Sequence, residues 1–119
     1  DGDTDIVIAN NAGPARLYRN DSPRARWLGV DLAATTDAGP GNARGSRVML
    51  EPGPCGERRV ATDGSYASAS DQRVLFGLDH NATPRTVRVR WTGGNTEWFG
   101  PLTVDRYHLL RRGTGRSTR

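Results

Sequence analysis

Residues 85–91 read RTVRVRW, and this stretch decides the fold class. Val87, Val89 and Trp91 occupy alternate positions, and Arg88 and Arg90 lie between them. Successive side chains of a β-strand point to opposite faces of its sheet. The alternation therefore predicts a half-buried strand, with the two valines and the tryptophan in the core and the two arginines in solvent.

The rest of the chain repeats patterns of this kind at short intervals. Turn signals rich in Gly, Pro, Asn and Asp separate the segments, for example residues 37–45 (DAGPGNARG) and 51–56 (EPGPCG). No stretch shows the spacing of an amphipathic helix. Eight or nine short strands predict an all-β fold, an antiparallel β-sandwich or open barrel. The further predicted strands are 5–9, 16–19, 27–34, 46–50, 58–62, 73–76, 96–99 and 106–111.

Length and composition agree with one small β domain. The 119 residues and 12.9 kDa of the chain suffice for a single core that buries roughly 65% of the unfolded surface. An apolar content of 34%, with 15 Gly and 7 Pro, favours a turn-rich β protein over a helical one. No apolar run approaches the roughly 18 residues that span a bilayer, so we expect no membrane span.

The charge of the chain raises the question of an anionic partner. The net charge is +4 and the pI is about 10.2, and every one of the 17 basic residues is an arginine. These arginines are scattered along the sequence, and many stand at alternate strand positions, as in RTVRVRW. We expect a solvated arginine-rich sheet face and no nucleic-acid partner. Binding to an acidic polymer or a nucleic acid is the alternative.

Residue types that carry catalysis or bind metals are sparse. Cys55 is the single cysteine, which excludes an intrachain disulfide. His80 and His108 lie far apart in the sequence and share no ligand spacing with a carboxylate. The segment 62–72 (TDGSYASASDQ) holds serines and aspartates, but a Ser-His-Asp arrangement would rest on residue counts alone. We therefore predict no catalytic residue.

A ligand-binding edge is the more specific hypothesis for segment 62–72. Asp63 and Tyr66 could form a sugar-binding edge, with Trp91 or Trp98 as the platform on which a ring stacks. The competing interpretation places Tyr66 at the rim of the sandwich and the tryptophans in the core, because aromatic side chains dominate small β cores. Both interpretations remain open from the sequence.

The first ten residues, DGDTDIVIAN, lead an acidic run into an apolar strand. Asp1, Asp3 and Asp5 would repel one another unless a cation lay between them. The pattern therefore predicts part of a calcium loop. The competing interpretation is an acidic terminus that leads into an edge strand.

Two segments resemble known modules. Residues 1–22 resemble the C-terminal half of an FG-GAP or VCBS-type repeat, the calcium-binding unit of integrin-α-like propellers. Residues 23–113 resemble the ASPIC/UnbV domain through WLGVDLAATTDAGPGNARGSRVML, RRVATDGSYASASDQRVLFGLDH and TVRVRWTGGNTEWFGPLTVDRYHLLRRG. The chain has WTGG where that family commonly has Trp-Pro-Ser-Gly, which loosens the turn. Residues 114–119 are expected to be a disordered basic tail.

The resemblance implies a role and a cellular context. The ASPIC/UnbV family is named for cartilage acidic protein and for a protein of enediyne biosynthetic clusters, and its domains follow such repeats in secreted or cell-envelope proteins. The implied function is a non-enzymatic recognition or assembly module of a larger extracytoplasmic protein, with a protein or glycan ligand. The alternatives are a carbohydrate-binding module, and an accessory or catalytic factor in enediyne-type biosynthesis.

The resemblance to the repeat also assigns places in a calcium loop. Asp1, Gly2, Asp3 and Asp5 match its fifth, sixth, seventh and ninth positions, and the first carboxylates of the loop would precede residue 1. Calcium prefers six to eight oxygen ligands. We therefore expect an incomplete site in this chain, with calcium as a cofactor of a longer protein.

Overall fold

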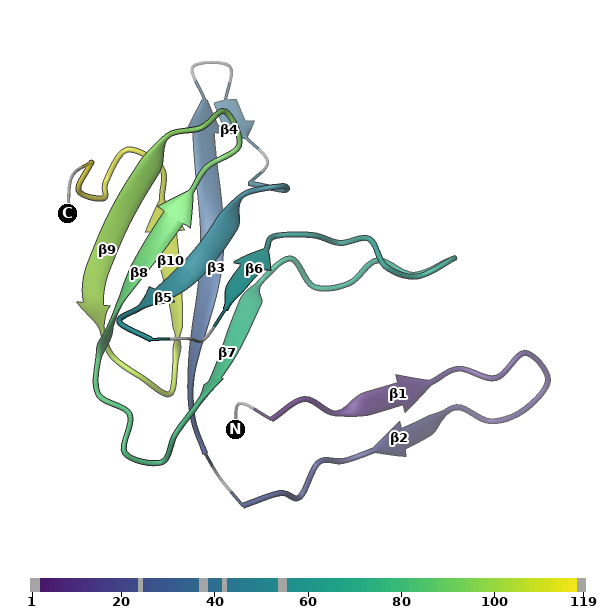
Figure 1. The fold of residues 1–119 in the computed structure, drawn as a ribbon. Coiled ribbons are helices and arrows are strands. Elements are labelled where there is room, and N and C mark those ends of the chain that lie inside the picture. The colour runs from purple at the N-terminus through teal and green to yellow at the C-terminus, as the bar shows by residue number, and fades with distance from the viewer. Residues whose placement is uncertain (1–2, 24, 37–38, 42, 54–55, 118–119) are drawn as a thin grey trace.

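The computed structural model describes residues 3–23, 25–36, 39–41, 43–53 and 56–117. These residues form strands and turns and no helix, and the strands pair in three sheets (Figure 1). The predicted all-β fold is confirmed. The strands are β1 Ile6–Ile8, β2 Arg16–Tyr18, β3 Arg26–Thr36, β4 Gly39–Gly41, β5 Arg47–Glu51, β6 Glu57–Arg59, β7 Val74–Leu78, β8 Arg85–Arg90, β9 Thr96–Leu102 and β10 Tyr107–Arg111.

The first layer of the body is built around β3, the longest strand. Its first half pairs antiparallel with β7, its last residues pair antiparallel with β4, and β10 runs parallel to it on the other side. Leu28, Val30, Leu32 and Ala34 alternate along β3 and are all buried. The period of two places them on the inner face of the sheet.

The second layer is the antiparallel sheet β6-β5-β8-β9. Val48 of β5 lies opposite Val89 of β8, and Leu50 lies opposite Val87, and all four side chains are fully buried. Trp91, just after β8, is 2% exposed. The alternation predicted for residues 85–91 is confirmed, since Val87, Val89 and Trp91 all belong to the core.

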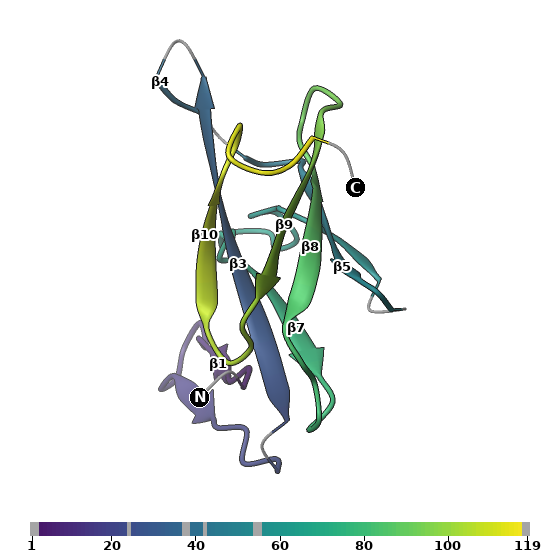
Figure 2. The same ribbon diagram turned by 90° about the vertical axis from the view of Figure 1, so that its left-hand side faces the viewer.

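The two layers enclose a single hydrophobic core (Figure 2). The inner faces of β3, β7 and β10 supply part of it, and those of β5, β8 and β9 supply the rest. Phe76 of β7 is almost completely buried in this core, as is the larger Trp91. This arrangement of packed sheets confirms the predicted sandwich. The prediction that all strands pair antiparallel is wrong for one pair, because the chain crosses from β9 in one sheet to β10 in the other and β10 then runs parallel to β3.

Strand β4 was not expected from the sequence. Gly39–Gly41 lies within the stretch 37–45 that was interpreted as a turn, yet it pairs with residues 34–36 of β3. The segment Gly-Pro-Gly has no alternating apolar and polar side chains, so no sequence pattern marks it as a strand. All nine strands that the sequence predicts have a counterpart in the structure.

The segment after β10 is held against β9. Arg116 forms an antiparallel bridge with Trp98, and each residue donates its backbone N–H to the carbonyl of the other. Gly113 and Gly115 donate their N–H groups to the carboxylate of Glu97, which is 7% exposed. Residues 114–117, expected to be disordered, are thus ordered by a buried acceptor. Residues 118–119 lie outside the described part of the chain.

Strands β1 and β2 form a hairpin apart from the sandwich, and it projects from the body (Figure 1). Its apolar side chains are exposed, among them Val7 at 68% and Leu17 at 67%. Asp5 closes its base by accepting the N–H of Asn20 at 2.8 Å. Strands β1 and β2 therefore pair only with each other, and the strands of the sandwich begin with β3.

Candidate functional site

A long loop between β6 and β7 projects from the body on the same side as the hairpin (Figure 1). We call residues 62–72 of this loop the arm. The N–H of Ser70 donates to the carbonyl of Thr62 at 2.9 Å, which closes the base of the arm. Gly64 has a φ of 122°, a value that a side chain would oppose, so the chain can bend there.

Tyr66 lies in the arm with its side chain entirely in solvent. Its relative exposure is 105%, the highest value among the large hydrophobic residues that the structure describes as exposed. A tyrosine ring that contacts nothing in its own chain forgoes the stabilisation that burial would give. Such a residue at the end of a loop is available to a partner.

Asp63 lies near the base of the arm and is held by Arg59 of β6. One Nη of Arg59 lies 2.8 and 3.0 Å from the two carboxylate oxygens. This hydrogen bond from the guanidinium is the main reason why the pKa of Asp63 is lowered. Asp63 therefore remains ionised and serves to fix the arm to β6.

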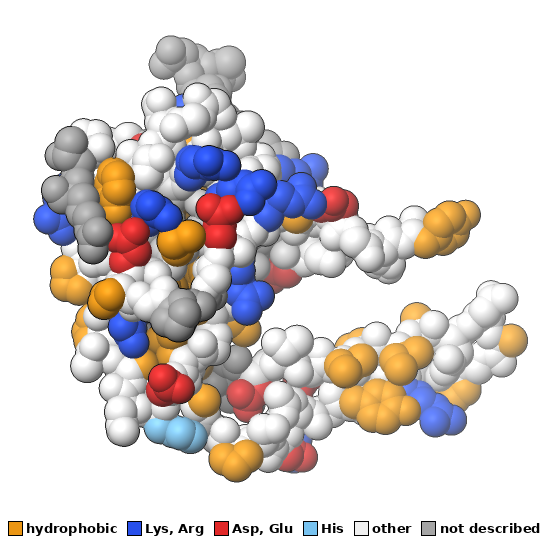
Figure 3. All heavy atoms as spheres, viewed as in Figure 1, with side chains coloured by type: hydrophobic (Ala, Val, Ile, Leu, Met, Phe, Trp, Pro, Cys, Tyr) orange, Lys and Arg blue, Asp and Glu red, His pale blue; other side chains and the backbone are white. Residues whose placement is uncertain are grey.

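A cleft of about 710 Å³ lies where the arm, the hairpin and the body meet. Its floor comes from β6 and β7 with the ends of the arm, and Asp3, Thr4 and Asn20 form the hairpin side. Figure 3 shows the hollow between the two projecting segments. The cleft is open to solvent and carries both positive and negative side chains.

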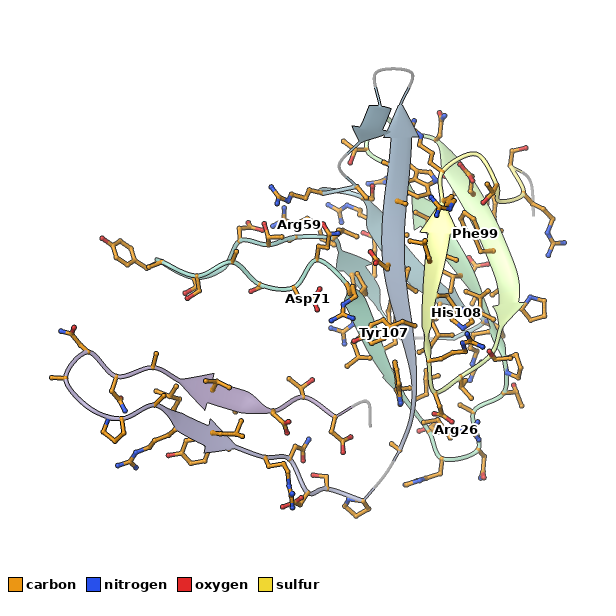
Figure 4. The ribbon with its side chains drawn as sticks, turned by 180° about the vertical axis from the view of Figure 1, so that it is seen from behind. Arg26, Arg59, Asp71, Phe99, Tyr107 and His108 are labelled. Atoms are coloured by element: carbon orange, nitrogen blue, oxygen red, sulfur yellow. The ribbon has the colours of Figure 1, made fainter. Side chains whose placement is uncertain are left out.

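The charged side chains on the floor of the cleft are organised in pairs. Asp71 accepts hydrogen bonds from Nε and Nη2 of Arg73 at 2.8 and 2.5 Å, and these bonds lower the pKa of Asp71 and raise the pKa of Arg73. Figure 4 shows Arg59 and Asp71 at the base of the arm. Arg59 offers donors and Asp71 offers acceptors to a polar ligand there.

The guanidinium of Arg73 also lies over the ring of Tyr107, 4.5 Å from its centroid. Tyr107 in turn meets Trp27 edge to face, with 5.1 Å between the ring centroids. The ring of Tyr107 covers Gly29 of β3, where a Cβ atom would lie 2.2 Å from a ring carbon. This stack outside the first sheet fixes the orientation of Arg73.

The structure separates the four predicted ligand-binding residues. Asp63 and Tyr66 lie together in the arm. Trp91 is buried at 2%, so it cannot offer a stacking surface to a sugar, and its role is in the core. Trp98 is half-buried in β9, opposite Arg88 and Arg116, on the outer face of the second sheet.

The predicted calcium ligands are only partly described. Asp1 lies outside the described residues, and Asp5 is engaged with the N–H of Asn20. Asp3 lines the cleft. Within the described ranges, no three His, Cys, Asp or Glu side chains meet in a way that could hold a metal.

The two histidines do not meet the acids and serines of the arm. The Nε2 of His108 is hydrogen-bonded to the carbonyl of Thr103 at 2.7 Å, and Figure 4 places His108 on β10, away from Asp71. His80 is exposed in the turn after β7. Cys55 lies outside the described residues.

The described residues contain no helix that is long and apolar enough to cross a membrane.

The sequence did not identify the cleft floor. The sequence places Arg59 and Arg73 in predicted strands and Asp71 in segment 62–72, without bringing the three together. Their pairing depends on where the arm returns to the body, and Ser70 reaches Thr62 through a backbone bond that leaves no sequence pattern. The spacing of the two ion pairs, Arg59 to Asp63 and Asp71 to Arg73, was the available signal.

Comparison with known proteins bears on most of the sandwich, from the end of β3 onward. The family model described as ASPIC and UnbV matches residues 36–117, which is more than half of the chain and includes the arm. No curated protein and no solved structure matches the chain. The matched region runs from the end of β3 to the segment that Glu97 anchors. The chain belongs to the ASPIC and UnbV family.

Proposed function

We propose that this domain is a non-enzymatic recognition module of a larger extracytoplasmic protein, and that it binds a protein partner through the arm and the cleft beside it. Tyr66 is the central contact residue of this proposal. The observation that carries it is the complete exposure of Tyr66 on a projecting loop. The resemblance of residues 1–22 to half of a calcium repeat supports the wider context.

The composition of the arm fits protein recognition. Segment 62–72 consists largely of Ser, Ala, Asp and Gly around a single Tyr. Binding loops of antibodies use the same chemistry, because tyrosine supplies a large rigid contact area and small polar residues supply adaptable hydrogen bonds. Long loops without regular structure in compact domains usually serve binding.

The cleft supplies the polar part of such an interface. Tyrosine and arginine are enriched among the residues that dominate binding energy. Arg59 and Arg73 are held in place by Asp63 and Asp71, so little side-chain entropy is lost when a partner contacts them. A partner segment that lies along the arm would contact Tyr66 and the cleft together.

Peptide selection tests the proposal. Random peptides displayed on phage are selected against the 119-residue chain, and the affinities of the selected peptides are then measured by calorimetry. We expect Tyr66→Ala to weaken binding at least about tenfold, which corresponds to about 1.4 kcal/mol. The variant should remain as stable as the parent, because the removed ring has no contacts in the folded chain.

Leu109→Ala is the matched control. Leu109 is also an exposed apolar residue, at 53%, but it lies on β10 of the first sheet. Its loss should leave the affinity within about twofold. Selected peptides that bind Tyr66→Ala as tightly as the parent chain would contradict the proposal.

A further inference from the structure

The outer face of the second sheet gathers arginines that the sequence scatters. Arg59, Arg47 and Arg90 lie directly opposite one another on β6, β5 and β8. The next row consists of Glu57, Met49, Arg88, Trp98 and Arg116 on successive strands and the segment after β10. Residues directly opposite in neighbouring strands share a face, so the two rows form one surface. We call it the arginine face.

The net charge of the arginine face is positive. Among the residues that the structure describes, the two rows carry five arginines and one glutamate, Glu57, and Glu51 occupies the next position of β5 on the same face. Figure 3 shows the arginine side chains as a band across the front of the body. Like charges directly opposite one another destabilise a sheet. The row Arg59-Arg47-Arg90 therefore costs stability that an anionic ligand would restore.

The arginines differ in how far they are neutralised. Arg47 pairs with Glu57, and Arg59 pairs with Asp63 from the arm. Arg88 lies 3.4 Å from Glu51. The guanidinium of Arg90 makes no hydrogen bond and no ion pair with any residue that the structure describes. The hydrogen bond from Arg47 is the main cause that lowers the pKa of Glu57, and the charge of Arg90 contributes to the same shift, but no hydrogen bond within the described residues fixes the Arg90 guanidinium.

A hollow of about 120 Å³ lies beside Arg90. Arg47, Met49, Glu57, Arg88, Arg90 and Thr96 line it. Guanidinium groups from neighbouring strands converge on it, and the planar fork of arginine matches a carboxylate with two parallel hydrogen bonds. The hollow therefore brings three arginine side chains within reach of a carboxylate group.

The arrangement of the two rows selects among polyanions. Glu57 and Glu51 would repel the closely spaced phosphates of a nucleic acid, which needs many simultaneous cation contacts for firm binding. A polysaccharide that bears carboxylates carries hydroxyl groups between its charges, and these hydroxyls can donate to the two glutamates. Trp98, at the end of the second row, offers an aromatic surface to the apolar face of a sugar ring.

We propose that the arginine face binds an acidic polysaccharide whose carboxylates contact Arg90 and its neighbours. This surface shares Arg59 and Glu57 of β6 with the cleft, but it does not include Tyr66 or the arm. Binding here does not depend on the protein partner proposed for Tyr66, so Tyr66→Ala should leave it unchanged.

The probe is oligogalacturonate, and a neutral oligosaccharide of equal length is the control ligand. Binding of each to the 119-residue chain is measured by calorimetry at low and at near-physiological salt. We expect binding of the acidic probe alone. Arg90→Gln should weaken it at least about fivefold. This variant should fold, because Arg90 is exposed and holds no partner among the described residues. We also expect the acidic probe to change the tryptophan fluorescence of the chain, and this change should be absent in Trp98→Phe.

Arg111→Gln is the matched control, since it removes the same charge from an exposed strand residue of the other sheet. It should change the affinity by less than about twofold. The proposal fails if oligogalacturonate does not bind, if the neutral sugar binds equally, or if both arginine variants weaken binding alike. Tighter binding of a single-stranded oligonucleotide than of oligogalacturonate would also overturn it, in favour of a nucleic-acid face.

Discussion

Replacing Glu97 by Gln should detach the segment after β10 from the sandwich. The Glu97 carboxylate is nearly buried and accepts the N–H of Gly113 at 2.9 and 3.1 Å and the N–H of Gly115 at 2.9 Å. These contacts hold the turn that places Arg116 opposite Trp98. The carboxylate thus connects the core to the arginine face.

The size of the effect follows from the hydrogen bonds. A glutamine keeps one acceptor oxygen and turns an N–H donor toward the other glycine N–H. One hydrogen bond to a charged group is lost, at about 1.5–3 kcal/mol, and the relief of a buried charge offsets a part of this. We expect a loss of about 2 kcal/mol, or a fall of about 1 M in the urea midpoint for a slope of about 2 kcal/mol/M.

Urea unfolding followed by tryptophan fluorescence measures this change, and hydrogen exchange at Gly113 and Gly115 locates it. Glu57→Gln is the control, because it removes an equal charge from an exposed ion pair with Arg47, and exposed pairs contribute little to stability. Equal midpoints for the two variants, or unchanged amide protection at both glycines, would refute the role of Glu97 as an anchor.

The remaining predictions concern the core, the aromatic stack and the arm. Val89→Asp should abolish cooperative unfolding in urea and Arg88→Asp should not, since only Val89 is fully buried, and equal damage would contradict the register of β8. Gly29→Ala should destabilise the chain by about 1–2 kcal/mol, because the added Cβ displaces the ring of Tyr107. The same change should be nearly neutral in a Tyr107→Ala background, and a double-mutant cycle without coupling would disprove the contact. The pKa of Asp63 is lowered by Arg59, so its contribution to stability is present above its unfolded pKa near 4 and is lost as pH falls through the lower folded value. Asp63→Asn should therefore be slightly less stable than the parent in urea at neutral pH, and the difference should disappear as pH falls below about 4. A difference that is absent at neutral pH, or that persists unchanged in acid, would contradict this assignment.

The sequence predicts the strands of this domain well because their signal is local. In RTVRVRW the period of two alone assigns Val87 and Val89 to the core, and both are fully buried. Strand β4 is not predicted because Gly-Pro-Gly has no alternating pattern of apolar and polar side chains. The order in residues 114–117 escapes it because the acceptor, Glu97, lies on a different strand.

The candidate sites depend more strongly on register. Tyr66 can be identified from the sequence as an aromatic residue in a polar segment, but its complete exposure follows from the projection of the arm. The row of Arg59, Arg47 and Arg90 joins residues from three strands. A shift of one residue in either pairing would turn one strand over and dissolve the row. Arginines that look scattered along the sequence therefore form one surface in space.

Amide chemical-shift mapping on the isotopically labelled chain tests the proposed function most directly. The tightest selected peptide is titrated into the protein, and shifts are followed for every assigned amide. The proposal predicts the largest shifts in residues 62–72 and at the cleft floor around Arg59 and Arg73. Shifts confined to other surfaces, with the amide of Tyr66 unaffected at saturation, would contradict the claim that this domain recognises its partner through the arm.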